Sequence, residues 1–232
     1  ANFKGDAFRL PGGGPALAID TVEANLGINV DHYVRINFTA FETLIDEIGG
    51  IVIDVPQSID DPSYPDCCDG YDPFYISDGS QHMDGSTALK YARTRATYGA
   101  DFDRAARQQQ VLLAVREKVL SLTMLPTLIA RAPKLYSALA GSYDTDMTLE
   151  EMVDLMSLAK KIEREDIEST VIDGDYIMNE FTTADGAQVV LLDARAFRSL
   201  REQMFYNPAP LPQSTMDPTG LAIEETATIQ VQ

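Results

Sequence analysis

A strand–helix–strand pattern near the start of the chain constrains its fold more than any other feature. Val30–Phe38 has the apolar and β-branched composition of a strand, and Thr39 can cap a helix over Phe41–Ile48. Two glycines end that helix, and Ile51–Val55, which is apolar except for Asp54, then indicates a short buried-type strand. This alternation predicts an α/β fold in which helices cover a central mixed β-sheet.

Similar signals continue along the chain. Thr148 and Glu151 have the spacing of a capping box, and Asp84 and Asp193 stand where further helices would begin. Residues 56–80 hold four prolines and many aspartates, which indicates a long irregular loop. The expected elements also include helices over residues 15–26, 84–92, 103–121, 126–139, 148–162 and 193–205, and strands over residues 169–172 and 188–192.

Composition divides the chain into three parts. Residues 1–206 are expected to form one domain, since 45% of the 232 residues are hydrophobic and can bury a core. Prolines concentrate in residues 207–223, which indicates a linker, and residues 224–232 become β-like again. No stretch of the sequence approaches the roughly 18–20 consecutive apolar residues of a membrane span.

Charge and cysteine content limit the possible partners. The formal net charge is −18, and an acidic surface repels phosphate backbones, so we expect no nucleic-acid binding. The two cysteines, Cys67 and Cys68, are adjacent, and a ring between neighbours is strained. We interpret them as two loop thiols, with disulfides to another molecule as the alternative.

Against this acidic background, arginines cluster in one short window. Four of the 12 arginines lie in the 15 residues from Arg93 to Arg107. Arg93 and Arg95 are two residues apart where a helix gives way to extended chain, so both side chains can point the same way. Arg104, Arg107 and Gln108 have i, i+3, i+4 spacing and share one side of the next helix. The pattern predicts several guanidinium groups in one cleft.

Such a cleft suits a phosphate-rich ligand. A guanidinium group is planar and permanently charged, and it can bind two oxygens at once. Several of them repel one another unless a polyanion lies between them, and a pyrophosphate meets that requirement. Asp101 can orient an arginine, act as a base or bind a metal. The alternative is a solvated helix face with ion pairs such as Asp103–Arg107; it accounts less well for the arginines that precede the helix.

The arginine cluster is part of a longer sequence pattern. Its upstream half contains Asp31-His32-Tyr33-Val34 and, further on, Gly49-Gly50. Its downstream half contains Met83-Asp84-Gly85, Ala88-Leu89, Tyr91-Ala92-Arg93-Thr94-Arg95, Asp101-Phe102-Asp103-Arg104 and Arg107-Gln108-Gln109. This pattern resembles the LytR–CpsA–Psr family. The resemblance covers residues 10–125 closely and extends loosely to residue 206.

The resemblance implies a function and a site. Members stand on the outer face of the bacterial membrane, held by an N-terminal helix, and transfer a glycan polymer from a polyprenyl-pyrophosphate carrier to peptidoglycan. A magnesium ion bridges the pyrophosphate oxygens. Asp101 matches an acidic position in the site and, with Arg104, is the expected catalytic pair. The positions that match the family's pyrophosphate ligands are Arg93, Arg95, Arg104, Gln108 and, more loosely, Arg107.

The sequence also departs from the family pattern. The family's metal-binding aspartates and a further arginine lie in N-terminal stretches that we do not find, so no metal ligand is identified in this chain. We therefore expect residues 1–206 to be a catalytic domain without its first strands, and inactive alone. Residues 224–232 resemble the opening strand of a C-terminal domain that many members carry.

Further expectations concern the binding of the lipid tail and the type of reaction. A polyprenyl tail needs an apolar channel, which we expect between helices 103–121 and 126–139, lined by Val111, Leu112 and Leu128 among others. Aromatic residues of the proline-rich loop, such as Tyr64, are interpreted as loop packing, with an apolar site as the alternative. Two other functions stay open: a pyrophosphate hydrolase that uses water as acceptor, and a non-enzymatic binder of pyrophosphate lipids.

Overall fold

The computed structural model describes residues 13–66, 68, 70–121, 124, 126–128, 130, 141–184, 186 and 188–205. One compact unit is His32–Ala196, and the described residues up to Asp31 and from Phe197 fall to a second unit. The predicted linker and the segment after it lie outside the described residues, as does most of the helix expected over residues 126–139. Every residue of the predicted site lies in the larger unit.

Helix α3 (Phe38–Glu47) begins the core of that unit. Its N-cap is Asn37, whose Oδ1 accepts the N–H of Ala40 at 2.8 Å. The predicted cap at Thr39 is therefore wrong by two residues, because an asparagine carbonyl oxygen already satisfies the first turn. On the inner side of α3, Ile45 is fully buried.

Strand β2 (Ile51–Val55) confirms a predicted element but not its environment. It pairs antiparallel with β5 (Gly79–Met83), with Ile51 opposite Met83. Burial alternates along β2, so that Ile51 and Ile53 are buried while Val52 is exposed. The sequence had indicated a buried strand; in a two-stranded sheet only one face packs on the helices, and Val52 and Asp54 lie on the exposed face.

The proline-rich segment is more ordered than expected. Within it, β3 (Ile59–Asp61) and β4 (Phe74–Ile76) pair as an antiparallel hairpin. The prediction of a wholly irregular loop is therefore wrong. The prolines lie before and between the two strands, where a missing N–H breaks no ladder. The rings of Tyr64 and Phe74 pack with centroids 6.3 Å apart, which ties the turn to the sheet.

The turn of this hairpin contains the second cysteine. Asp66 organises the turn, since its Oδ1 accepts the backbone N–H groups of Cys68 and Gly70, each at 2.7 Å. Cys68 is disulfide-bonded. The interpretation as a loop thiol is therefore wrong for Cys68, and Cys67 lies outside the described residues.

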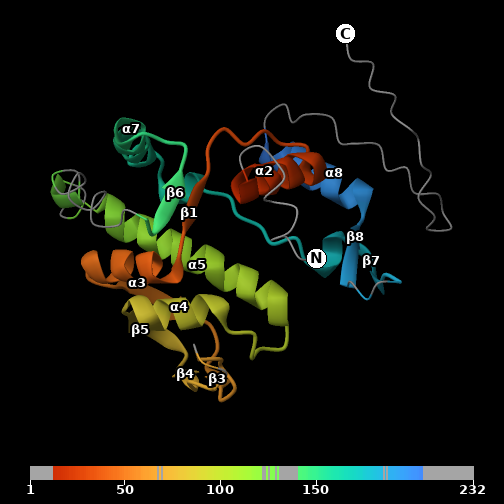
Figure 1. The fold of residues 1–232 in the computed structure, drawn as a ribbon, viewed down its shortest axis with the longest axis horizontal. Helices are drawn as coiled ribbons and strands as arrows, with labels where there is room; N and C mark the ends of the chain where they lie inside the picture. The colour runs from red at the N-terminus through yellow and green to blue at the C-terminus, as the bar shows by residue number, and fades with distance from the viewer. Residues whose placement is uncertain are drawn as a thin grey trace, which may run out of the picture. The chain divides into compact units, whose positions relative to one another are not determined.

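Helices α4 (Gly85–Arg93) and α5 (Ala100–Leu120) complete the core, and α4 packs against both α3 and α5 (Figure 1). Asp84 caps α4 as predicted. Gly85 permits the close approach of α3 and α4. A Cβ atom at this position would lie 2.3 Å from the backbone oxygen of Glu42, so only glycine fits without a shift of backbone.

The remaining strands form two pairs, and one strand that the sequence predicted is absent from the described residues. Residues 169–172, expected as a strand, have no regular structure, so that prediction is wrong. The carbonyl of Thr170 accepts the Nε2 of Gln109 at 2.6 Å in place of a neighbouring strand. The other elements are α2 (Gly13–Leu26), β1 (Val34–Ile36) paired with β6 (Tyr143–Thr145), α7 (Leu149–Ala159), two short 3-10 helices η1 (Arg164–Asp166) and η2 (Gly174–Tyr176), β7 (Ile177–Thr182) paired with β8 (Gln188–Leu192), and α8 (Ala194–Met204).

Two predicted helix caps are confirmed in this part of the chain. Thr148 and Glu151 form the reciprocal capping box at the start of α7. Asp193 accepts the N–H of Ala196 at 2.9 Å at the start of α8. In the smaller unit, the buried Arg201 donates to the carbonyl of Gly27 at 3.4 Å, just beyond α2.

The α/β class is confirmed, but the strands of the described residues form several small sheets instead of one large sheet. Over the described residues they pair as four separate two-stranded antiparallel sheets, and no central mixed sheet joins them. None of the helices in the described part of the chain combines the length and the apolar character needed to cross a membrane.

Candidate functional site

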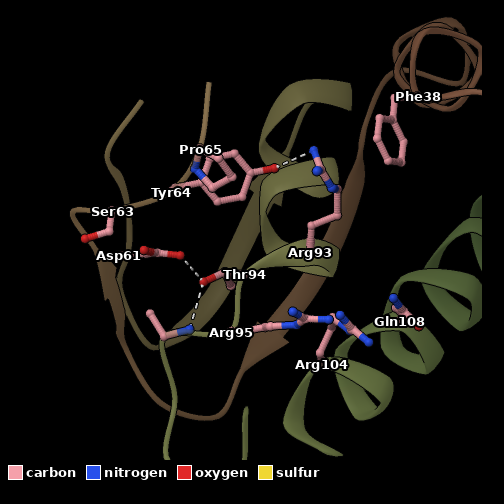
Figure 2. A pocket seen from close by; sticks show the side chains of 11 residues that line it. Phe38, Asp61, Ser63, Tyr64, Pro65, Arg93, Thr94, Arg95, Arg104 and Gln108 are labelled. Atoms are coloured by element: carbon pink, nitrogen blue, oxygen red, sulfur yellow. Dashed lines mark hydrogen bonds between the residues drawn. The ribbon is translucent and has the colours of Figure 1, made fainter. Parts of the chain in front are cut away.

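A pocket of about 670 Å³ opens where the end of α4 meets the start of α5. Arg93 is the last residue of α4, Arg95 follows in the connecting segment, and Arg104 lies on α5. Figure 2 shows Arg95 and Arg104 pointing toward one another across the pocket. The pocket is lined by Phe38, Asp61, Ser63, Tyr64, Pro65, Arg93, Thr94, Arg95, Ala96, Arg104 and Gln108.

Four of the predicted ligands therefore line one cavity: Arg93, Arg95, Arg104 and Gln108. Gln108 lies on α5, and its Nε2 donates to the carbonyl of Ala92 on α4 at 3.3 Å. That carbonyl belongs to the last turn of α4, where no intrahelical N–H is available. Gln108 thus joins the two helices at the point where the pocket forms.

The structure places Arg107 apart from the predicted ligands. Its side chain is 5% exposed and does not line the pocket. Its Nε donates to the carbonyl of Tyr91 at 3.0 Å, and its other nitrogens donate to the carbonyl of Thr94 and, at 3.2 Å, to the hydroxyl of Thr97. Burial lowers the pKa of Arg107 below its ordinary value. Arg107 is therefore a positioning residue that holds the segment after α4 against α5.

Asp101 connects the exposed Arg95 with the half-buried Arg104. Its Oδ1 lies 2.7 Å from Nε of Arg95 and 3.2 Å from Nη2 of Arg104. The carboxylate is more than half exposed, so each ion pair is screened by water. Three roles were predicted for Asp101, and this geometry fits the first of them, the orientation of arginines.

Arg93 is held by two aromatic rings. Its guanidinium carbon lies 4.2 Å from the ring centroid of Phe38, a cation–π contact. On the other side, Nη1 of Arg93 donates to the phenolic oxygen of Tyr64 at 3.2 Å (Figure 2). Burial raises the pKa of Tyr64, and the charge of Arg93 offsets this only in part. The phenol is therefore neutral and keeps a proton that it can donate into the pocket.

Asp61 and Thr94 form the floor of the pocket. Asp61 is 8% exposed and Thr94 is 1% exposed, and the Thr94 hydroxyl donates to Oδ2 of Asp61 at 2.5 Å. The same hydroxyl accepts the N–H of Ala96 at 3.2 Å, which shapes the segment between the arginines (Figure 2). A hydrogen bond to a buried carboxylate contributes about 1.5–3 kcal/mol.

Sequence reasoning did not identify several of these residues as part of the site. Phe38, Asp61 and Thr94 were not singled out, and Tyr64 was assigned to loop packing. Thr94 lies between two clustered arginines, which is a signal that could have been used. Asp61 and Phe38 are brought to the pocket by tertiary packing over 33 or more residues of sequence, for which one sequence carries no local signal.

An apolar groove of about 300 Å³ adjoins the pocket. Three residues line both cavities, namely Phe38, Arg93 and Gln108. The groove therefore begins at the edge of the arginine-lined pocket. Its other walls come from β1, α3, α4 and α5, namely Ile36, Asn37, Phe41, Leu89, Ala92, Val111 and Leu112. Of the predicted channel residues, Val111 and Leu112 line this groove, whereas Leu128 is buried in the core.

The combined site has a definite chemical character. Three guanidinium groups face one cavity, and Asp101 neutralises part of their charge. The site is suited to an anion with several oxygens that is attached to an apolar chain. Among the described residues, no group of three or more His, Cys, Asp or Glu side chains is placed to hold a metal ion.

Comparison with known proteins identifies the family of the chain. The model of the LytR_cpsA_psr family matches residues 7–205. Since this match covers most of the chain, the protein belongs to the LytR–CpsA–Psr family.

The individual relatives that match this chain have moderate sequence identity to it. The chain is 31% identical over 163 residues to the polyisoprenyl-teichoic acid–peptidoglycan teichoic acid transferase TagV of Bacillus subtilis, covering 70% of this chain and 40% of that protein. It is 33% identical over 174 residues to the polyisoprenyl-teichoic acid–peptidoglycan teichoic acid transferase TagU of Halalkalibacterium halodurans, covering 72% of this chain and 53% of that protein. The chain thus spans about half, or less, of the length of these curated relatives.

Solved structures have the same fold. The crystal structure of B. subtilis TagV matches with a TM-score of 0.64 at 27% identity, covering 85% of this chain and 71% of that one. Protein gbs0355 of Streptococcus agalactiae also matches with a TM-score of 0.64, at 24% identity, covering 89% and 69%. At this identity the second match supports the fold alone.

Proposed function

We propose that this protein transfers a glycan polymer from a polyprenyl-pyrophosphate carrier to peptidoglycan. The observation that carries the proposal is the junction of an arginine-lined pocket with an apolar groove, which share Phe38, Arg93 and Gln108. A pyrophosphate attached to a prenyl chain has the same two parts in the same order. The teichoic acid transfer for which TagV and TagU are named is in line with this proposal.

In the proposed reaction, the acceptor hydroxyl oxygen attacks the phosphorus atom that carries the glycan. A new P–O bond forms to the acceptor, and the bond from that phosphorus to the bridging oxygen breaks. Polyprenyl phosphate leaves with the electron pair, and the hydroxyl proton passes to solvent. Negative charge builds up on the leaving phosphate. Hydrogen-bond donors that are already positioned around it stabilise this charge in the transition state and so lower the barrier to reaction.

The residues of this chain have separate tasks in the proposal. Arg95 and Arg104 bind the pyrophosphate oxygens, and Arg93 binds the lipid-side phosphate at the mouth of the groove. Asp101 orients two of these arginines rather than acting on the substrate. Tyr64 donates its phenolic proton to a phosphate oxygen, since its own oxygen already accepts from Arg93.

We include a magnesium ion in the proposal on the family resemblance alone. The described residues gather no set of carboxylates for it, and Asp101 is engaged with two arginines. The residues present do not fit the ion by themselves, so we derive no step through it. We also propose, on the same resemblance, that the reaction takes place at the outer face of the cytoplasmic membrane, where the acceptor lies.

A labelled-glycan assay tests the proposed reaction. The protein is incubated with a polyprenyl-pyrophosphate-linked glycan and isolated peptidoglycan, and products are separated. We expect label on peptidoglycan together with free polyprenyl phosphate. Free glycan phosphate alone would indicate hydrolysis, and tight binding without any product would indicate a carrier-binding protein.

Charge reversal connects the assay to the site. Arg104→Glu should abolish both pyrophosphate binding and transfer, because it places a carboxylate among the remaining guanidinium groups. Arg198→Glu is the matched control, since Arg198 is an exposed arginine on α8 that lines none of the site. Equal activity of the two variants would remove the arginine pocket from the reaction.

A further inference from the structure

A second pocket, of about 410 Å³, lies on the other side of the segment that carries the arginines. Ala96 lines both pockets, so the second pocket is a neighbour of the first. Its walls come from the β2–β3 connection, the segment after α4, and α5. Pockets that bind small ligands have volumes of this order, about 300–1,000 Å³.

The chemistry of the second pocket differs from that of the first. Of the described residues that line it, Arg107 is the one cation, and its three nitrogens already donate to Tyr91, Thr94 and Thr97. Its guanidinium is therefore buried and held by acceptors of the protein itself. The groups that face a ligand are neutral amides and hydroxyls with one carboxylate, from Gln57, Ser58, Thr97, Asp103 and Gln110.

An aromatic ring stands at the edge of this pocket. Tyr98 is fully exposed, although burial would be the usual state of a large ring. It lies in a tight turn closed by two hydrogen bonds, from the N–H of Ala100 to the carbonyl of Thr97 at 3.0 Å and from the N–H of Gly99 to Oδ2 of Asp103 at 2.9 Å. The ring is thus presented to solvent by a closed turn rather than by a loose one.

The same turn contains strained backbone. Ala100 has a φ of 41°, in the left-handed region that is unfavourable for any residue with a Cβ. Such conformations cost of order 1–3 kcal/mol and are concentrated at functional sites. The strain is maintained by the two hydrogen bonds that also fix Tyr98.

These observations together point to one kind of ligand. A sugar ring is uncharged, presents hydroxyl groups to amides and carboxylates, and has an apolar face that packs on an aromatic ring. We propose that the second pocket is a glycan subsite, which holds a sugar residue while the pyrophosphate occupies the arginine pocket. This inference rests on the proposed function. The sugar can belong either to the transferred glycan or to the acceptor strand.

Two probes distinguish the sources of the sugar. The acceptor probe is the peptidoglycan tetrasaccharide (GlcNAc–MurNAc)₂, which carries no phosphate. The donor probes are geranyl-pyrophosphoryl-GlcNAc and geranyl pyrophosphate, which differ by the sugar alone. Affinities are measured by calorimetry for the wild type, Tyr98→Ala and Tyr98→Phe. Tyr75→Ala is the matched control, because Tyr75 is also exposed but lines neither pocket.

We expect Tyr98→Ala to weaken binding of the sugar about three- to tenfold, as for the loss of one aromatic contact. Tyr98→Phe and Tyr75→Ala should bind as the wild type does. An effect on the tetrasaccharide assigns the subsite to the acceptor. Loss of the affinity that GlcNAc adds to geranyl pyrophosphate assigns it to the donor.

The experiment separates this inference from the function on which it rests. If Tyr98→Ala alters neither the tetrasaccharide nor the GlcNAc increment, or if the wild type shows neither, the glycan subsite is refuted. If geranyl pyrophosphate fails to bind the wild type, the proposed function fails, and the tetrasaccharide still reports on the second pocket. Geranyl pyrophosphate should bind wild type and Tyr98→Ala equally; unequal binding would show that the two pockets are not separate and would overturn the assignment.

Discussion

Replacing Arg107 with methionine should destabilise the fold, and should weaken pyrophosphate binding only as a consequence. Methionine fills much of the same volume but donates nothing. The carbonyls of Tyr91 and Thr94 would lose a charged donor, and each such bond contributes about 1.5–3 kcal/mol. The hydroxyl of Thr97 is partly exposed and can turn to water. We therefore expect a loss of about 3–5 kcal/mol in the free energy of unfolding.

Urea unfolding followed by circular dichroism measures this loss. With a slope of about 2 kcal/mol per molar, typical of a domain of this size, the midpoint should fall by about 2 M. Arg107→Lys should lose nearly as much, because an ammonium group cannot reproduce the planar fork that bonds two carbonyls. Arg104→Met is the matched control on the same helix and should keep the wild-type midpoint.

The two interpretations of Arg107 give opposite results. If Arg107 were a pyrophosphate ligand, as its i, i+3 relation to Arg104 predicts, Arg107→Met would keep the wild-type midpoint and lose affinity for inorganic pyrophosphate. Arg107→Lys would then retain part of that affinity through its charge. Either result would refute the positioning role that we assign from its burial and hydrogen bonds.

Three further outcomes follow from the same contacts. Arg104→Met should weaken binding of inorganic pyrophosphate at least tenfold in calorimetry, about 1.4 kcal/mol or more, because a charge-assisted contact is lost; unchanged affinity would return Arg104 to a solvated helix face. Gly85→Ala should lower the free energy of unfolding by about 1–3 kcal/mol, since the new methyl group would meet the backbone oxygen of Glu42; wild-type thermal stability would contradict the close approach of α3 and α4. Hydrogen bonds from Thr87 lower the pKa of Asp84 below its ordinary value of 3.8, so its stabilising effect is present above that pH and is lost as pH falls through the lower folded value. Asp84→Ala should therefore cost about 1 kcal/mol at neutral pH and progressively less as pH falls below 3.8, as checked by urea unfolding over that range; an equal cost at every pH would exclude the charged cap.

The fold was predictable where local chemistry decides it. The caps at Asp84 and Asp193 and the capping box at Thr148 depend on residues three positions apart, and each was found as expected. The absence of a strand at residues 169–172 was not predictable from these residues, because a strand forms only where a partner strand lies beside it. There the backbone binds a side chain from α5 instead.

The site was likewise predictable only where local sequence spacing decides its geometry. The arginine spacing predicted a shared cleft, and the structure places Arg93, Arg95 and Arg104 around one pocket. Spacing could not separate Arg104 from Arg107, since two residues at i and i+3 lie on one side of a helix and the rotation of α5 against α4 decides which one is buried. Asp61 is brought in by a hairpin inside the proline-rich segment, whose pairing is set by tertiary packing.

The ion pairs of Asp101 give the site a threshold for ligand charge. Before any ligand binds, this carboxylate already occupies Arg95 and Arg104. An incoming anion must exchange with it, and a monoanion gains little by replacing one negative charge with another. A pyrophosphate carries more charge and more oxygens, so the exchange favours it. A polymer with single-charged phosphodiesters along its length would therefore be bound at its pyrophosphate end, and not at random along the chain.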